Sequence, residues 1–90
     1  MVVKFFAYLR DYTGCLETSM PAVPVVGELV RVLGEKYGQR LRNKLLTENG
    51  DLGPHIIIMI NGRHIVHLGG LDAPLKEDDI VQIFPKVAGG

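Results

Sequence analysis

The order of extended and helical segments predicts an α+β domain in which a mixed sheet packs against one main helix. Short runs rich in Val, Ile, Phe and Tyr are typical of strands. They lie on both sides of one longer stretch, residues 26–37, whose apolar residues repeat at helical spacing. The expected order is two strands, one helix and three further strands. Strands that gather in this way, without alternating with helices, favour an α+β architecture.

Two strands are expected before the helix. Residues 2–9 predict the first, because Val, Phe and Tyr are enriched there. Its alternate residues would share one face: Val3, Phe5, Ala7 and Leu9. Residues 10–14 are typical of a turn in which Gly14 adopts positive φ, and residues 16–23 predict a short second strand. Together the two strands would form an N-terminal hairpin.

The helix predicted over residues 26–37 has one apolar face and one charged face. The apolar face consists of Val26, Leu29, Val30, Leu33 and Tyr37. Val25 offers no capping side chain, and Glu28 in the first turn partly compensates through the helix dipole. Gly38 is expected to end the helix in the left-handed conformation, and residues 39–46 predict a shorter second helix.

A polar loop at residues 47–54 separates the helices from the next strands. Residues 55–60 are apolar without alternation, which predicts a strand covered on both faces. Asn61-Gly62 is a strong signal for a two-residue hairpin turn, and it leads to a partner strand at residues 63–66. Gly69-Gly70 would end that strand.

The last strand leads to a tail of small residues. A connector at residues 71–79 precedes this strand, which is predicted over residues 80–84. We expect Pro85 to end it, because proline has no backbone N–H. The printed chain closes on Gly89 and Gly90, which lack side chains and suit a narrow channel of another protein. The plain alternative is a frayed end.

Length and composition bound the function. Ninety residues with a 47% hydrophobic share suit one folded domain, with a body expected at residues 1–85 and a flexible tail at residues 86–90. Ten basic and ten acidic residues give a formal net charge of zero, so the overall positive charge typical of nucleic-acid binding is missing and no nucleic-acid partner is expected, while a local basic patch stays open. We read no leader peptide, no membrane span and no disulfide pair, so a cytoplasmic protein without a membrane partner is expected.

The sequence predicts no self-contained active site. His64 and His67 lie three apart on a predicted strand and would point to opposite faces, so no metal site is predicted. Cys15 has no activating neighbour in the sequence, which favours a half-exposed structural thiol over a nucleophile. The acidic residues 77–79 are more typical of a solvated turn than of a catalytic pair. We therefore expect no bound cofactor, and no enzyme activity of the chain on its own.

Five stretches of the chain, taken in order, resemble one protein family. They are residues 5–10 (FFAYLR), 26–29 (VGEL), 61–62 (NG), 69–75 (GGLDAPL) and 84–90 (FPKVAGG). They are similar to the β-grasp, ubiquitin-like sulfur carriers of the MoaD/ThiS type, and most similar to the small subunit of molybdopterin synthase. The chain departs from the family pattern at Lys86, where a second proline is usual, at Val25, where a capping residue is usual, and at residues 77–79, where Asp-Gly-Asp is usual.

This resemblance implies a β-grasp fold with four to five strands wrapping one main helix. It also implies that an E1-like enzyme adenylates the Gly90 carboxylate with ATP, and that a sulfur donor then converts it to a thiocarboxylate. The large subunit of molybdopterin synthase, in a heterotetramer, would hold the catalytic residues and use this sulfur to build the molybdenum or tungsten (molybdopterin) cofactor. The remaining tail residues would contact these partners: Pro85, Lys86, Val87, Ala88 and Gly89.

Two alternatives share this fold. In one, the chain is a ubiquitin-like modifier that forms isopeptide bonds with target lysines through Gly90. In the other, it is a β-grasp interaction module whose glycine tail has no chemical role. Formation of a thiocarboxylate, formation of isopeptide-linked conjugates, and indifference to capping of the terminus distinguish the three.

Overall fold

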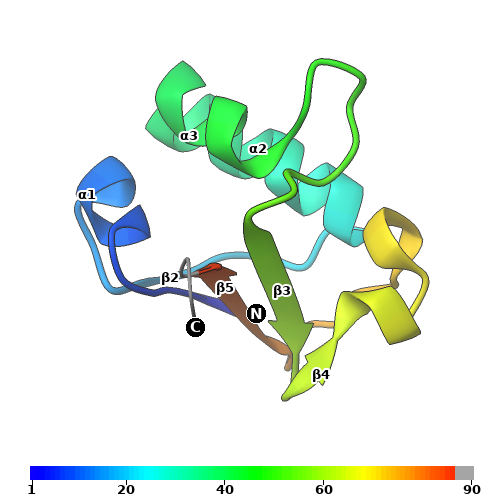
Figure 1. The fold of residues 1–90 in the computed structure, drawn as a ribbon. Helices are drawn as coiled ribbons and strands as arrows, with labels where there is room; N and C mark the ends of the chain where they lie inside the picture. The colour runs from blue at the N-terminus through cyan, green and yellow to red at the C-terminus, as the bar shows by residue number, and fades with distance from the viewer. Residues whose placement is uncertain (87–90) are drawn as a thin grey trace.

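The computed structural model describes residues 1–86 of the chain. A five-stranded sheet forms one layer, and two helices lie across one of its faces (Figure 1). The strand order is β2-β1-β5-β3-β4; β1 and β5 run parallel, and the other neighbouring pairs are antiparallel. The α+β class and the mixed sheet are thus confirmed. The strands are β1 (Val2–Phe5), β2 (Glu17–Ser19), β3 (Ile56–Ile60), β4 (Arg63–His64) and β5 (Ile80–Pro85).

The first strand is shorter than predicted, because the chain turns into a short helix, α1 (Leu9–Thr13). Ala7 has a φ of 53°, so the extended face that was expected to include Ala7 and Leu9 ends at Phe5. Leu9 still reaches the core, but from the helix. The positive φ predicted for Gly14 is confirmed, with a value of 71°. Gly14 adopts it at the C-terminal end of α1.

The main helix, α2 (Val26–Tyr37), is confirmed with the predicted bounds. No side chain caps its N-terminus. The amide of Val26 instead donates to the carbonyl of Ala73 at 3.0 Å, so the connector supplies the missing partner. The prediction for Gly38 is wrong in conformation, because its ψ of 173° lies outside the left-handed helical region. This geometry leads directly into α3 (Gln39–Leu45), the second helix expected from the sequence.

The Asn61-Gly62 turn is confirmed. Asn61 and Gly62 have φ values of 51° and 84°, and Ile60 pairs with Arg63 across the turn. The partner strand ends earlier than predicted, because a 3₁₀ turn, η1 (Ile65–His67), buries the side chain of Ile65. A second 3₁₀ turn, η2 (Gly70–Asp72), opens the connector to β5.

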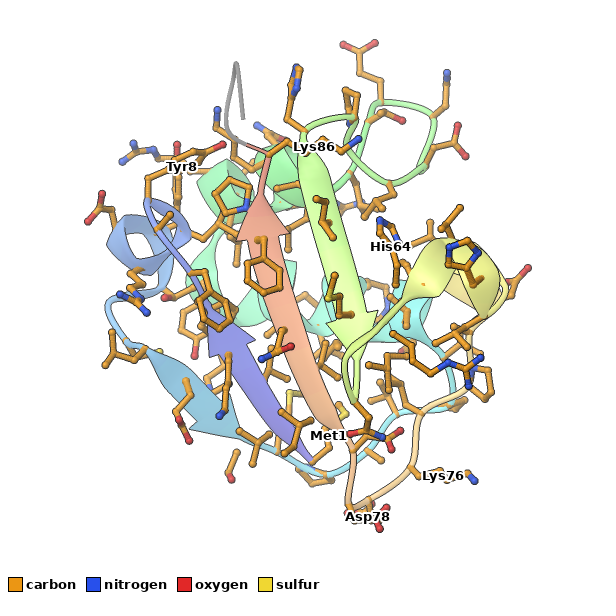
Figure 2. All side chains as sticks on the ribbon, turned by 60° about the horizontal axis from the view of Figure 1, so that its bottom comes forward. Met1, Tyr8, His64, Lys76, Asp78 and Lys86 are labelled. Carbon is orange, nitrogen blue, oxygen red and sulfur yellow. The ribbon has the colours of Figure 1, made fainter. Side chains whose placement is uncertain are left out.

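The core lies between the helices and one face of the sheet. The strands contribute alternate residues to it: Val3, Phe5, Ile56, Ile58, Ile60, Val81 and Ile83. The expectation that β3 is covered on both faces is wrong, because Ile57 and Met59 are only half-buried. They lie on the sheet face that neither α2 nor α3 covers, which faces the viewer in Figure 2.

The turn before β5 contains a buried carboxylate. Asp79 is 7% exposed and accepts hydrogen bonds from the side-chain amide of Asn61 at 2.9 Å and from the backbone amide of Lys76 at 2.8 Å. The Asn61 side chain in turn accepts from the amide of Ile80 at 2.9 Å. Only part of the acidic run is therefore a solvated turn. Asp79 thus holds the start of β5 against the β3–β4 hairpin. This contact helps to set the register of β5 on β3, and the register determines which residue of β5 lies at its end.

Candidate functional site

The last strand holds the base of the tail. Pro85 is buried and pairs with Ile56 of β3, so β5 runs one residue further than predicted. The next amide, that of Lys86, donates to the carbonyl of His55 at 2.6 Å. Antiparallel pairs alternate their hydrogen bonds, so the Pro85 nitrogen faces the other neighbour, β1, which has already ended at Phe5. The missing N–H of proline is therefore tolerated inside this central strand.

Most of the predicted site residues lie outside the described part of the chain. These are Val87, Ala88, Gly89 and Gly90, whereas Pro85 and Lys86 are described. Four residues span at most about 14 Å when fully extended. Any partner that binds Gly90 must therefore bring its own surface close to Lys86.

The uncovered sheet face carries an apolar strip beside the tail base. The strip consists of Phe6, Ile57, Met59 and Phe84, all of them half-buried. The rings of Phe6 and Phe84 stack with centroids 4.3 Å apart, and Ile57 pairs with Phe84 across the strands. The sequence did not reveal this strip, because the run of isoleucines in β3 was read as buried on both sides. The available signal was in β5, where Gln82 lies between apolar residues. Gln82 pairs with Met59 and Phe84 pairs with Ile57, so this face of β3 is only partly covered.

A polar cleft lies on the other side of the tail base. It has a volume of about 990 Å³ and lies between α3, the loop after it, and Lys86. Four of its lining residues are basic and one is acidic: Arg42, Lys44, His55, Lys86 and Glu48. Tyr8 also lines it, and the Lys44 ammonium lies 5.7 Å from the centre of that ring. We call this hollow the basic cleft.

The predictions for the histidines and for the cysteine have different outcomes. The prediction that His64 and His67 point to opposite faces of a strand is wrong. The 3₁₀ turn η1 brings the centres of their rings within 6.4 Å of each other. Within residues 1–86, no cluster of three or more His, Cys, Asp or Glu side chains could hold a metal ion. Cys15 is half-buried, as predicted, and its sulfur lies 3.5 Å from the hydroxyl of Tyr37.

The shifted pKa values belong to an exposed ion pair on α2. Hydrogen bonds from Arg31 lower the pKa of Glu28, and the same bonds raise the pKa of Arg31. Glu35 also contacts Arg31, through a hydrogen bond of 2.5 Å. Neither Glu28 nor Arg31 lines the basic cleft or belongs to the apolar strip, so these shifts concern the helix surface.

No helix formed by residues 1–86 has both the length and the apolar character needed to cross a membrane.

Comparison with known proteins extends over nearly the whole chain. The model of the ThiS family matches residues 3–90. Small archaeal modifier protein 3 of Haloferax volcanii is 36% identical over 90 residues, which are 98% of this chain and 96% of that protein. A candidate sulfur carrier protein of Archaeoglobus fulgidus is 38% identical over 65 residues, which are 72% of this chain and 73% of that protein.

Solved structures show the same arrangement of strands and helices. Small archaeal modifier protein 1 of Methanosarcina acetivorans superposes with a TM-score of 0.86 at 34% identity, covering 99% of this chain and 94% of that one. A chain of the BexX/CysO complex of Amycolatopsis orientalis superposes with a TM-score of 0.83 at 26% identity, covering 99% of this chain and 98% of that one.

Proposed function

The chain belongs to the ThiS family of ubiquitin-like sulfur carriers and modifiers, and on this premise we propose that it is a sulfur carrier whose Gly90 carboxylate is the reacting group. The observation that carries the proposal is the fixed tail base. β5 lies at the centre of the sheet, Lys86 is tied to His55, and the family match continues from there to residue 90. The folded body, proposed as residues 1–85, then serves to present residues 86–90 to partner enzymes.

The proposed chemistry has two steps. An E1-like partner lets a Gly90 carboxylate oxygen attack the α-phosphate of ATP, which releases pyrophosphate and leaves an acyl adenylate. A sulfur nucleophile then attacks the acyl carbon and AMP departs. Hydrosulfide would give the thiocarboxylate directly, whereas a persulfide would give an acyl disulfide, which a second thiol of the donor cleaves to release the thiocarboxylate and form a disulfide on the donor. ATP and the sulfur donor are bound by the partners, and so are the acids and bases that move protons.

The finer proposal concerns the acceptor of the sulfur. The motifs that resemble the small subunit of molybdopterin synthase support a pterin precursor, held by a large subunit in a heterotetramer. The apolar strip supplies a docking surface for that subunit, because half-exposed aromatic rings next to the tail base suit the apolar centre of a protein interface. Phe6 and Phe84 would contribute the most buried area there.

Intact-mass spectrometry tests the proposal. The chain ending at Gly90 is incubated with the cognate activating enzyme, ATP and a sulfur source. The expected product is heavier by the replacement of one oxygen by sulfur, and fragmentation places the change at Gly90. A chain that keeps its mass while the enzyme activates a known carrier contradicts the proposal.

Protein modification is the second candidate, and it is favoured by the similarity to small archaeal modifier protein 3. Activation of Gly90 would be shared, but the acyl group would pass to a lysine amine and form an isopeptide bond. Digestion of cell extract and mass spectrometry separate the two. Trypsin would cut after Lys86, so a Val-Ala-Gly-Gly remnant on target lysines supports modification. A thiocarboxylate without such remnants supports sulfur carriage alone.

A further inference from the structure

The charges of the domain are distributed unevenly along β5. Near its C-terminal end, α3 has the sequence QRLRNKL, which contains three cations and no acid, and Lys86 follows the strand itself. The N-terminal end of β5 follows a turn that exposes Glu77 and Asp78. Figure 2 shows Lys86 and Asp78 at opposite ends of the sheet. Although the formal net charge is zero, the tail therefore leaves from a positive end of the molecule.

The basic cleft concentrates this charge at the tail base. Lys44, Arg42 and Lys86 line one hollow of about 990 Å³, and all three side chains are exposed. Their positions are fixed from below. Leu41 and Leu45 anchor α3 in the core, and the amide of Gly53 donates to the carbonyl of Leu45 at 2.8 Å. The backbone that carries Arg42 and Lys44 is thus anchored to the core.

We propose that the basic cleft is the docking site for an acidic segment of the activating enzyme, at the mouth of the channel that receives the tail. This inference rests on the proposed activation of Gly90 and names the part of the partner that must meet the domain. The tail beyond Lys86 reaches at most about 14 Å, so an enzyme that binds the Gly90 carboxylate has its channel mouth close to Lys86, which lines this cleft. Carboxylates at that mouth would be attracted by the cleft cations and would steer the tail toward the channel.

The cleft suits an acidic polypeptide better than nucleic acid. Non-specific nucleic-acid binding depends on a long basic track and on free aromatic faces for stacking. Here Glu48 interrupts the cations, so they form a short group and no long track. The ring of Tyr8 already faces Lys44, and that of Tyr12 faces Arg40 at 5.1 Å. A hollow lined by several cations suits a short loop that bears carboxylates.

Paired charge reversals test the proposal by steady-state ATP–pyrophosphate exchange with the cognate activating enzyme. The cleft variant carries Lys44→Glu and Lys86→Glu. The control variant carries Lys36→Glu and Lys76→Glu, on α2 and on the acidic turn. Each exchange lowers the formal charge by two, so both variants go from zero to minus four. Thermal melts of both variants verify that they fold.

We expect the cleft variant to raise the KM for the carrier by about tenfold or more, with kcat within about twofold of wild type. The control variant should shift KM by less than about twofold, and added salt should raise the KM of wild type more than that of the cleft variant. Equal KM shifts in both variants, or none in either, overturn the proposal. Wild type that is never adenylated is a different result, because it contradicts the proposed function itself.

A titration of the ¹⁵N-labelled chain, followed by NMR, tests the cleft without activity. The probes are a hexaglutamate peptide and a single-stranded uridine oligonucleotide. Shifts at the amides of Arg42, Lys44 and Lys86 with the peptide support the proposal. Tighter binding of the oligonucleotide at the same amides overturns it in favour of nucleic acid. Shifts that grow with protein concentration alone overturn it in favour of a second copy, whose own acidic turn would occupy the cleft.

Discussion

Removing Gly90 should separate folding from activation. The buried apolar core of residues 1–86 ends at Ile83, and the last backbone tie to β3 comes from Lys86. No residue of this core is lost by the truncation. The free energy of unfolding should therefore change by less than about 0.5 kcal/mol.

Activation should be lost because the tail base is fixed. The bond of 2.6 Å between the Lys86 amide and the His55 carbonyl prevents the tail from advancing without opening the end of the β3–β5 pair. Shortening the chain by one residue withdraws the carboxylate by about 3.3–3.6 Å. A misplacement of about 1 Å can cost about a hundredfold in rate, so kcat/KM for adenylation should fall by at least that factor.

The assay combines thermal melting with ATP–pyrophosphate exchange for the full-length and truncated chains. A third variant lacks Gly90 but carries one extra glycine between Lys86 and Val87, which restores the reach of the tail. We expect this variant to recover at least about tenfold in rate over the truncated chain, because reach is the limiting quantity. Unchanged adenylation of the truncated chain would refute the reasoning and place the interaction module first.

Three further outcomes are expected. Phe84→Ala should weaken binding of the large subunit that we propose as a partner by about tenfold in titration calorimetry. Leu16→Ala, at an exposed apolar residue away from the strip, should leave that binding unchanged, and equal effects of the two variants would argue against the strip. Asp79→Ala should lower the free energy of unfolding by about 2–4 kcal/mol in urea melts, because two hydrogen-bond donors lose a buried acceptor, whereas exposed Asp78→Ala should change it by less than about 0.5 kcal/mol. If Asp79→Ala lowered the free energy of unfolding by much less than this, water would have to replace the carboxylate as hydrogen-bond acceptor. Cys15→Ser should leave thiocarboxylate formation intact, since the sulfur is carried on the tail; loss of transfer in a folded variant would assign the thiol a role.

Local signals predicted the elements that depend on local physics. The bounds of α2 followed from apolar residues at a spacing of three and four, and the β3–β4 turn followed from Asn61-Gly62, the pair that most readily adopts two positive φ values. The tail was predicted from a proline followed by small residues, and it stays a prediction because residues 87–90 lie outside the described part of the chain. These patterns act within a few residues of the chain, so the sequence alone displays them.

Elements that depend on distant partners were not predicted. Leu9 was assigned to a strand because its neighbours favour one, yet packing of α1 against the core decides its conformation. The exposed side of β3 was missed because five apolar residues in a row do not reveal which faces are covered. The basic cleft joins α3, a loop and Lys86, which are far apart in the sequence, and no local pattern announces it.

The place of β5 in the sheet has a consequence for the order of folding. It is the last strand in the sequence, yet it lies in the middle of the sheet, between β1 and β3. Until residues 80–85 are available, the β1–β2 and β3–β4 pairs are separate parts of the sheet with open edges. A newly synthesised chain cannot complete its sheet early, and closing it requires contacts between the two ends of the chain. An enzyme that recognises the closed sheet would therefore activate finished molecules and pass over incomplete ones.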